Sequence, residues 1–566
     1  MRLSLSGEDR GHDEESKFTA VNGTIYLKPD IVPKGADPEK YLLWYFRHQL
    51  SHVHHCPYDI RTAYNLQRAA YEQVRDWGIA YLATQIFSDI QVDLYYLPRR
   101  FGELPYHTRI IGKGPSTLAE EIMNSIYLCV NPAVKIPDET LAKTAREILL
   151  ISSLDRPWQT KVQMIASVLQ RLRGRSRAFS KKEIERSIRR NPLNVREDFQ
   201  RSTIEGFFET YGSITDEKAA KEFYEHWIKP RLPSGEEKRA REALKLKMHR
   251  KKGEHGGLKD EKTDMKATKA MGDRQRTGGG YDLAVDLMDE PRLPTSMSKP
   301  YKKLRLKNLS EIMWKRYWFK SRAQRAIIHY LAESRRRRPV WSVIRYPDEW
   351  YIEDEIEDLD VETSLDEGPI IPEVTTLKWV EEPTPHGQSI SSGFVPSTIT
   401  VLDVSRSMGG VHNEAAVAAF IAHQSAWRSG GRTAVVTFST GYVSADWEAP
   451  EETKELALSM SFDEFTIFPS FEVQRLASEN KGPCFIVVIT DGGWQNVEEA
   501  VPSLKRISES GHSVIIFLIK GGEYHDRVEL IKRTPNLRIR NVVNPEADLH
   551  GLVLSESMRV YGRFVT

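Results

Sequence analysis

The sequence predicts a multi-domain chain with a helical N-terminal half and a C-terminal α/β domain built on a doubly wound parallel sheet. Its 566 residues are more than one hydrophobic core accommodates. Apolar residues recur at helical spacing through much of the first 230 residues, whereas strand-like and helix-like runs alternate from Val395 onward. Together these three observations favour separate domains over one large core.

The first 300 residues divide into two helical regions and a charged linker. Helical patterns occupy residues 38–90 and continue from residue 116 to residue 227. Between Pro230 and Pro294 large apolar residues become scarce and Lys and Arg outnumber the acidic residues, so most of this stretch cannot offset the entropy of ordering. We therefore expect a helical module at 1–115, a helical region at 116–230 and a flexible linker at 231–300.

A helix rich in aromatic residues and an acidic stretch follow the linker. The aromatic cluster Trp314–Phe319 lies within a helical pattern at 310–335 and is expected to pack against the last domain. From Asp348 to Glu367 carboxylates alternate with apolar residues, which is typical of a solvated acidic pair of strands. The alternative is an internal ligand that competes for a metal in the last domain. We assign 301–394 to a helix plus an acidic extension that packs on the α/β domain.

The α/β domain is expected to span 395–566. Continuous apolar runs such as Cys484–Thr490 are what a parallel sheet buried on both faces requires. Strands are predicted at 398–402, 433–438, 484–490, 513–519 and 537–542, and helices at 414–427, 452–460, 497–509 and 526–532. In such a sheet, ligands bind beyond the carboxyl ends of the strands where the strand order reverses.

Composition limits the classes of function. The chain is 40% hydrophobic and 28% charged with a net charge of +2, so any nucleic-acid binding would be local, and no folded reader motif accompanies the basic run Arg335–Arg338. Nucleic acid is therefore not an expected partner.

Three distant cysteines predict a reducing compartment, and the polar, acidic first residues lack a secretory pattern. The sequence contains no run of about 18 apolar residues, so it predicts no membrane span, and we expect a cytoplasmic protein.

A metal-binding loop is predicted where the first strand of the α/β domain ends. Asp403, Ser405 and Ser407 offer one carboxylate and two hydroxyls within five residues, and such oxygen donors suit Mg²⁺ or Mn²⁺. This D-x-S-x-S loop resembles the metal-ion-dependent adhesion site (MIDAS) of the von Willebrand factor A (VWA) family. The resemblance implies two more ligands, Thr466 in EFTIFPS and Asp491 in VVITDGG.

The resemblance also implies how such a domain works. One coordination position is left open, and a partner's Asp or Glu completes the metal shell. Because no general base or nucleophile accompanies the loop, the domain is expected to bind rather than catalyse, and no catalytic residue is assigned.

A histidine pair near the N-terminus predicts a second metal site. His48 and His52 are spaced i, i+4 on a helix, where two imidazoles can bind one Zn²⁺. The residue after the first histidine is Gln49, which cannot act as the general base that Glu supplies in zinc peptidases. On a second helix, Asp89 and Asp93 share one face and offer a third ligand.

This N-terminal pattern resembles the degenerate HExxH metallopeptidase-like region of archaeal-type VWA proteins. The resemblance implies zincin-like helices, a zinc set of His48, His52 and Asp89, and a MoxR-type AAA+ ATPase as the partner in a chaperone system. We therefore interpret the chain as an intracellular metal-dependent protein-interaction factor. The alternative is a zinc-dependent metallopeptidase that takes its base from elsewhere, such as Glu72. Two other interpretations stay open. The histidines pack in the core without binding a metal, or Cys56 is one of the zinc ligands.

Overall fold

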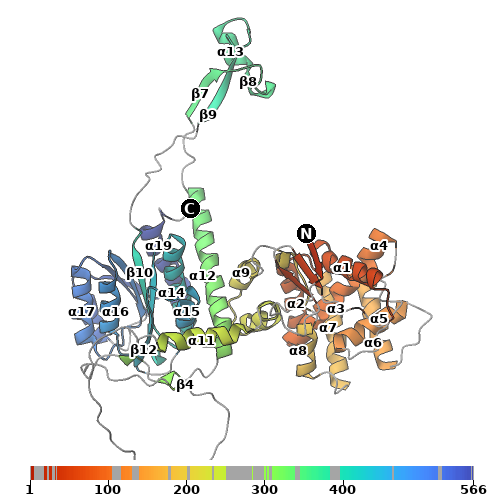
Figure 1. Ribbon diagram of the computed structural model, residues 1–566, viewed down its shortest axis with the longest axis horizontal. Helices are drawn as coiled ribbons and strands as arrows, with labels where there is room; N and C mark the ends of the chain where they lie inside the picture. Colours follow the sequence, from red (N-terminus) through yellow and green to blue (C-terminus); the bar gives the residue numbers. More distant parts are fainter. Residues whose placement is uncertain are drawn as a thin grey trace, which may run out of the picture.

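The computed structural model describes most of the chain (Figure 1). The described residues are 2–5, 18–21, 24–27, 32, 35–102, 104, 117–130, 139–175, 180–190, 192–199, 204–232, 235–249, 283–284, 299–300, 303–304, 309–337, 344–382, 395–461, 465–519, 525–562 and 564. Most of the predicted linker, including 250–282, lies outside them.

Helices form the N-terminal lobe, as predicted. Aspartates begin three of them: the side chains of Asp37, Asp59 and Asp76 accept hydrogen bonds from backbone N–H groups of the first turn. The helices are α1 (Pro38–His54), α2 (Ile60–Val74), α3 (Trp77–Ile90), the π-helical η2 (Gln91–Tyr96), α4 (Leu97–Phe101), α5 (Leu118–Val130), α6 (Glu139–Ser153), α7 (Trp158–Arg175), α8 (Lys181–Arg190) and η4 (Arg196–Phe199).

A small sheet precedes these helices and was not predicted. It pairs β1 (Arg2–Leu5) with β3 (Thr24–Leu27) in parallel, and β3 with β2 (Phe18–Val21) antiparallel. Each strand has four residues, which is too short for an alternating pattern to stand out in the sequence.

Bridging helices lie between the two lobes, with α11 and α12 at the centre of Figure 1. Close packing of α9 on α12 requires a glycine, because a Cβ on Gly212 would lie 2.5 Å from the Ser321 carbonyl oxygen. The elements are α9 (Glu205–Gly212), α10 (Glu217–Phe223), η5 (Tyr224–Ile228), η6 (Lys229–Arg231), α11 (Glu236–His249) and α12 (Leu309–Arg337).

The C-terminal lobe contains the predicted α/β sheet. Its strand order is β15-β14-β13-β10-β11-β12-β5, with β10 (Ser397–Asp403) in the centre. All neighbouring pairs are parallel except β11 with β12. The other strands are β5 (Lys299–Pro300), β11 (Thr433–Phe438), β12 (Gly441–Ala445), β13 (Cys484–Thr490), β14 (Ser513–Ile519) and β15 (Arg538–Val542). Two further short strands, β4 (Leu283–Ala284) and β6 (Lys303–Leu304), pair with each other.

Helices cover both faces of this sheet, so it is doubly wound as predicted. One face packs on α14 (His412–Arg428), α15 (Glu451–Leu458) and α19 (Pro545–Tyr561), and the other on α16 (Ser470–Glu479), α17 (Val497–Glu509) and α18 (His525–Lys532). The chain leaves β10 toward β11 on one side and reaches β13 on the other. The strand order therefore reverses at β10, and the loop predicted to bind a metal follows this strand.

One continuous core joins the N-terminal helices to the α/β lobe. Buried residues of α2, α3 and α7 connect through α12 to α14 and to one face of the sheet. Of the predicted aromatic cluster, Phe319 contacts Phe420 of α14, whereas Trp318 donates a hydrogen bond to the Ile214 carbonyl. The cluster thus packs on the bridging helices as well as on the last domain.

The acidic stretch forms a small sheet of its own. It comprises β7 (Ile344–Glu349), η8 (Ile356–Asp358), β8 (Leu359–Asp360), α13 (Val361–Glu367) and β9 (Leu377–Glu382), in the order β7-β9-β8. Figure 1 shows it apart from the α/β sheet, whereas we expected it to pack there. β7 pairs with β9 from Ile344↔Glu382 to Glu349↔Leu377, and β8 pairs with β9 at Leu359↔Lys378 and Asp360↔Leu377. Among the described helices, none has the length and apolarity needed to cross a bilayer.

Candidate metal centres

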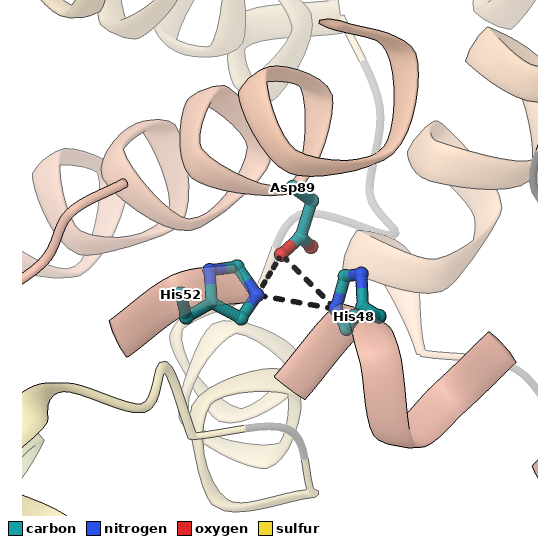
Figure 2. A group of neighbouring side chains, drawn as sticks. All are labelled: His48, His52 and Asp89. Carbon is teal, nitrogen blue, oxygen red and sulfur yellow. Dashed lines mark hydrogen bonds and ion pairs between the residues drawn. The ribbon is translucent and has the colours of Figure 1, made fainter. Parts of the chain in front are cut away.

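His48, His52 and Asp89 meet in the N-terminal lobe, and we call them the histidine centre. The histidines come from one face of α1 and the aspartate from α3, and all three side chains point to one spot (Figure 2). The two Nε2 atoms are 3.1 Å apart, and Asp89 Oδ1 lies 3.3 Å from His52 Nε2 and 3.8 Å from His48 Nε2. The three residues predicted as ligands are therefore brought together.

The Nδ1 atoms of both imidazole rings already have hydrogen-bond partners. His48 Nδ1 lies 2.8 Å from Asp93 Oδ1, and His52 Nδ1 lies 2.8 Å from the Cys56 carbonyl oxygen. A carboxylate and a carbonyl accept hydrogen bonds, so in the neutral rings each Nδ1 carries the proton and each Nε2 carries a lone pair.

Three lone-pair atoms therefore converge without a donor among them. This arrangement is repulsive unless a cation or an extra proton lies between them. Ligand atoms at zinc distances of about 2.0–2.1 Å in a tetrahedral shell are about 3.4 Å apart. The observed separations of 3.1, 3.3 and 3.8 Å bracket that value, so the donor set fits a zinc ion.

Buried groups behind the histidine centre fix its orientation. Asp93 is fully buried in the π-helical turn η2 and also accepts a hydrogen bond from the Tyr127 hydroxyl on α5. Burial lowers the pKa of His48, but the charges of Asp93 and Asp89 outweigh it and raise the pKa. A protonated His48 is thus the alternative to a metal at this place.

Three other residues weighed in the sequence lie outside the ligand set. The side-chain oxygen of Gln49 accepts a hydrogen bond from Asn194, so its amide ties α1 to the segment 192–195 that precedes η4. Burial raises the pKa of the Cys56 thiol to about 12, and its sulfur lies 3.7 Å from Ser88 Oγ, which keeps it a neutral core residue. Glu72 is about half exposed on α2 and pairs with Arg68.

The second candidate site, which we call the sheet-edge site, comprises Asp403, Ser405, Ser407, Thr466 and Asp491. Asp403 ends β10, and Asp491 directly follows the neighbouring strand β13, whose register pairs Leu402 with Ile489. The two carboxylates therefore stand side by side at the carboxyl edge of the sheet, where the strand order reverses.

Hydrogen bonds hold the loop after β10 in place. Asp403 Oδ1 accepts from the Ser405 backbone N–H at 3.0 Å, and its Oδ2 accepts from Thr490 Oγ1 at 2.6 Å. The hydroxyl oxygens of Ser405 and Ser407 are 3.1 Å apart. Two ligands at right angles around Mg²⁺, each at about 2.1 Å, would be about 3.0 Å apart, so this pair fits the ion.

Thr466 lies in a loop tied to the same edge. Its carbonyl oxygen accepts from the Gln495 N–H at 2.9 Å, and the next residue, Ile467, donates to the Ser439 carbonyl beyond β11 at 2.8 Å. Thr466 is buried, and residues 462–464 before it lie outside the described part of the chain.

Two buried carboxylates at this edge repel each other. Burial, followed by the nearby charge of Asp491, raises the pKa of Asp403 to about 7. A divalent cation would relieve this repulsion, and the oxygen-only donor set suits a hard ion.

Several residues at the two sites escaped sequence reasoning. Thr490 orients Asp403, and nothing in its strand pattern distinguishes it from other buried strand residues. Tyr127 reaches Asp93 from 34 residues away, which no local spacing reveals. The sequence placed Asp93 on the same helical face as Asp89, at i, i+4. In the structure, however, Asp93 bonds His48 Nδ1 and does not face the point where His48, His52 and Asp89 meet.

Comparisons with known proteins add little to this geometry. No family model matches the chain, and no curated protein does. Among solved structures, the chain is similar to a von Willebrand factor type A protein from Catenulispora acidiphila, with 14% identity and a TM-score of 0.24. The similarity covers 30% of this chain and 43% of that structure, and a TM-score this low does not establish a shared fold.

Proposed function

We propose that the chain is a cytoplasmic, metal-dependent protein-binding factor whose C-terminal lobe is a VWA domain with a MIDAS. The sheet-edge site would hold Mg²⁺, or Mn²⁺, and an Asp or Glu of a partner protein would complete the metal shell. One observation carries this proposal. The carboxylates of Asp403 and Asp491 lie at the sheet edge where the strand order reverses, beside the Ser405 and Ser407 hydroxyl oxygens, which are 3.1 Å from each other.

We propose a MoxR-type AAA+ ATPase as that partner, acting with this chain as a chaperone. Support for this choice comes from the sequence resemblance, since the geometry fixes only the chemistry of the contact. A metal with an open position selects a carboxylate and not one particular protein.

Co-purification from the native host in buffer with Mg²⁺ tests both proposals. The wild type should bring down an AAA+ ATPase, and chelation should release it. A Ser405→Ala/Ser407→Ala variant should lose the interaction, whereas Ser478→Ala on α16 should keep it. A protein retained equally by all variants and in chelator would contradict the metal-dependent contact.

For the histidine centre, we propose a Zn²⁺ ion bound by His48, His52 and Asp89. Its support is the convergence of three lone-pair atoms described above. Zinc here would join α1 to α3 and stabilise the lobe. Since Gln49 carries no titratable group and its amide bonds Asn194, the residues at this centre supply no general base.

Elemental analysis of the purified protein tests the zinc proposal. About one equivalent of zinc is expected in the wild type, as for a single tetrahedral site. A His48→Ala/His52→Ala variant should contain none. His54→Ala is the matched control, because His54 lies on the same helix but is exposed. A wild type without zinc would leave a protonated His48 as the explanation of the geometry.

A zinc-dependent metallopeptidase is the second candidate. The observation in its favour is the partial exposure of Asp89, whose side chain is 16% accessible, because a catalytic metal needs a route for substrate. Chelator-sensitive peptide cleavage by the wild type would support it. Activity that appears only in Gln49→Glu would instead indicate a zinc peptidase centre without its base.

A further inference from the structure

Residues 344–382, which we call the acidic module, have a one-sided charge. They contain fourteen Asp and Glu against two basic residues, whereas the whole chain has a net charge of +2. One of those two basic residues, Lys378, is already ion-paired with Asp354. The acidic module therefore carries a strong negative charge in a chain that is otherwise basic.

The acidic module also leaves most of its large apolar side chains in solvent. Among the large apolar side chains that the structure describes in this module, eight are exposed, Leu359 and Leu377 are partly buried, and Trp350 is buried. Ile352, Ile356 and Val374 are 66%, 74% and 70% exposed. The others are Tyr351, Val361, Leu365, Ile370 and Ile371. Single exposed apolar residues are ordinary, but so many in one small module mark an interaction surface.

These side chains gather at one end of the acidic module. The Ile352 N–H bonds Glu373 Oε1 at 3.5 Å, which places the loop after β7 beside the loop that carries Val374. Val361 and Leu365 lie one turn apart on α13. In Figure 1 the module stands clear of both lobes, with α13 at the end farthest from them.

We propose that this end of the acidic module is a docking surface for a basic amphipathic segment of another protein. Its negative charge repels nucleic acid and anionic lipid surfaces, and small counter-ions would leave the aliphatic side chains in water. A segment with alternating cationic and aliphatic side chains neutralises the carboxylates and covers the apolar surface at once.

Fluorescence anisotropy with a labelled helical peptide of leucine and lysine tests this surface on the full-length chain. Binding should weaken as salt rises, since exposed charges are screened. Ile356→Ser/Val374→Ser should weaken binding on the order of tenfold, because two aliphatic contacts are lost. Leu150→Ser on α6, where Leu150 is 65% exposed, is the matched control and should bind like wild type.

Three results would overturn the proposal. Equal weakening by Leu150→Ser would indicate non-specific adsorption, and salt-sensitive binding unchanged by Ile356→Ser/Val374→Ser would indicate attraction by charge alone. Self-association in sedimentation that these substitutions abolish would make a second copy of the chain the occupant. The substitutions touch neither metal centre, so each result leaves the proposed metal-dependent function to be judged by its own experiments.

Discussion

At the scale of single residues, the histidine centre is supported by Asp93 as well as by its three proposed ligands. Asp93 holds the proton on His48 Nδ1 and so directs the Nε2 lone pair toward His52 and Asp89. We predict that Asp93→Asn weakens zinc binding by about 10–100-fold, since an amide neither fixes this tautomer nor supplies a negative charge. Competition with a zinc-binding dye measures the affinity.

Tyr127→Phe should weaken zinc binding in the same direction by a smaller factor. The Tyr127 hydroxyl orients Asp93, and without it the Asp93 carboxylate loses one buried hydrogen bond. Tyr95→Phe in η2 is the control and should bind zinc like wild type. Unchanged affinity in Asp93→Asn, with zinc present in the wild type, would show that His48 needs no support from this carboxylate.

Residue spacing determines how much of the candidate sites could be predicted. His48 and His52 are one helical turn apart, so the sequence alone places them on one face. Asp403, Ser405 and Ser407 lie within one loop and are equally local. That α3 brings Asp89 to the histidines, and that α5 brings Tyr127 to Asp93, depends on how helices pack, which no local pattern encodes.

At the scale of elements, a partly buried ion pair holds α12 to the C-terminal lobe. Both terminal nitrogens of Arg322 bond the Glu414 carboxylate of α14 at 2.8 and 2.9 Å, and His550 of α19 contacts the same group at 3.0 Å. Arg322→Met should lower the free energy of unfolding by about 2 kcal/mol, less than for a fully unpaired buried charge because Glu414 keeps His550. Denaturant titration measures this.

Arg325→Met on the same helix provides the matched control. Arg325 pairs with Glu209 in solvent, with side chains 37% and 61% exposed, so its loss should cost less than about 1 kcal/mol. Equal destabilisation by both substitutions would show that the ion pair of Arg322 contributes no more than a surface pair.

Acid should weaken the contact between α12 and α14. Burial raises the pKa of Glu414, but His550 and Arg322 lower it to about 2 from an ordinary value of 4.5. Because the folded pKa is the lower one, the stabilisation is present above pH 4.5 and is lost as pH falls toward 2. Urea titrations across this range should show falling stability, with a shallower fall in Arg322→Met. An equal slope in both proteins would assign the acid sensitivity to other carboxylates.

The elements themselves were predictable where burial is complete. The strands β11, β13 and β14 have the predicted bounds because each is a predominantly apolar run between two helical layers. The antiparallel strand β12 begins with Gly441 and is short, and α19 contains Gly551, which weakens helix propensity. Neither element has a strong hydrophobic periodicity in the sequence. Packing on neighbouring elements sets their positions, rather than the intrinsic helix or strand propensity of their residues.

At the scale of the whole molecule, the two candidate metal centres lie in different lobes that one hydrophobic core connects. The core that begins around α2 and α3 continues through α12 to the sheet face covered by α14 and α19. A chain whose lobes share buried surface in this way unfolds as one unit more readily than a pair of lobes joined by a linker.

Zinc bound at the histidine centre should therefore stabilise the distant α/β lobe. A ligand that binds only the folded state at 100 times its dissociation constant adds about 2.7 kcal/mol to a cooperative unit. We predict a single unfolding transition that shifts to higher denaturant when zinc is added. A thiol probe monitors it through Cys484, which is buried in the sheet, in a Cys56→Ala/Cys129→Ala background so that no other cysteine reacts. His48→Ala/His52→Ala should abolish the shift. Two transitions, with exposure of Cys484 insensitive to zinc, would mean that the helix α12 joins the lobes without coupling their stabilities.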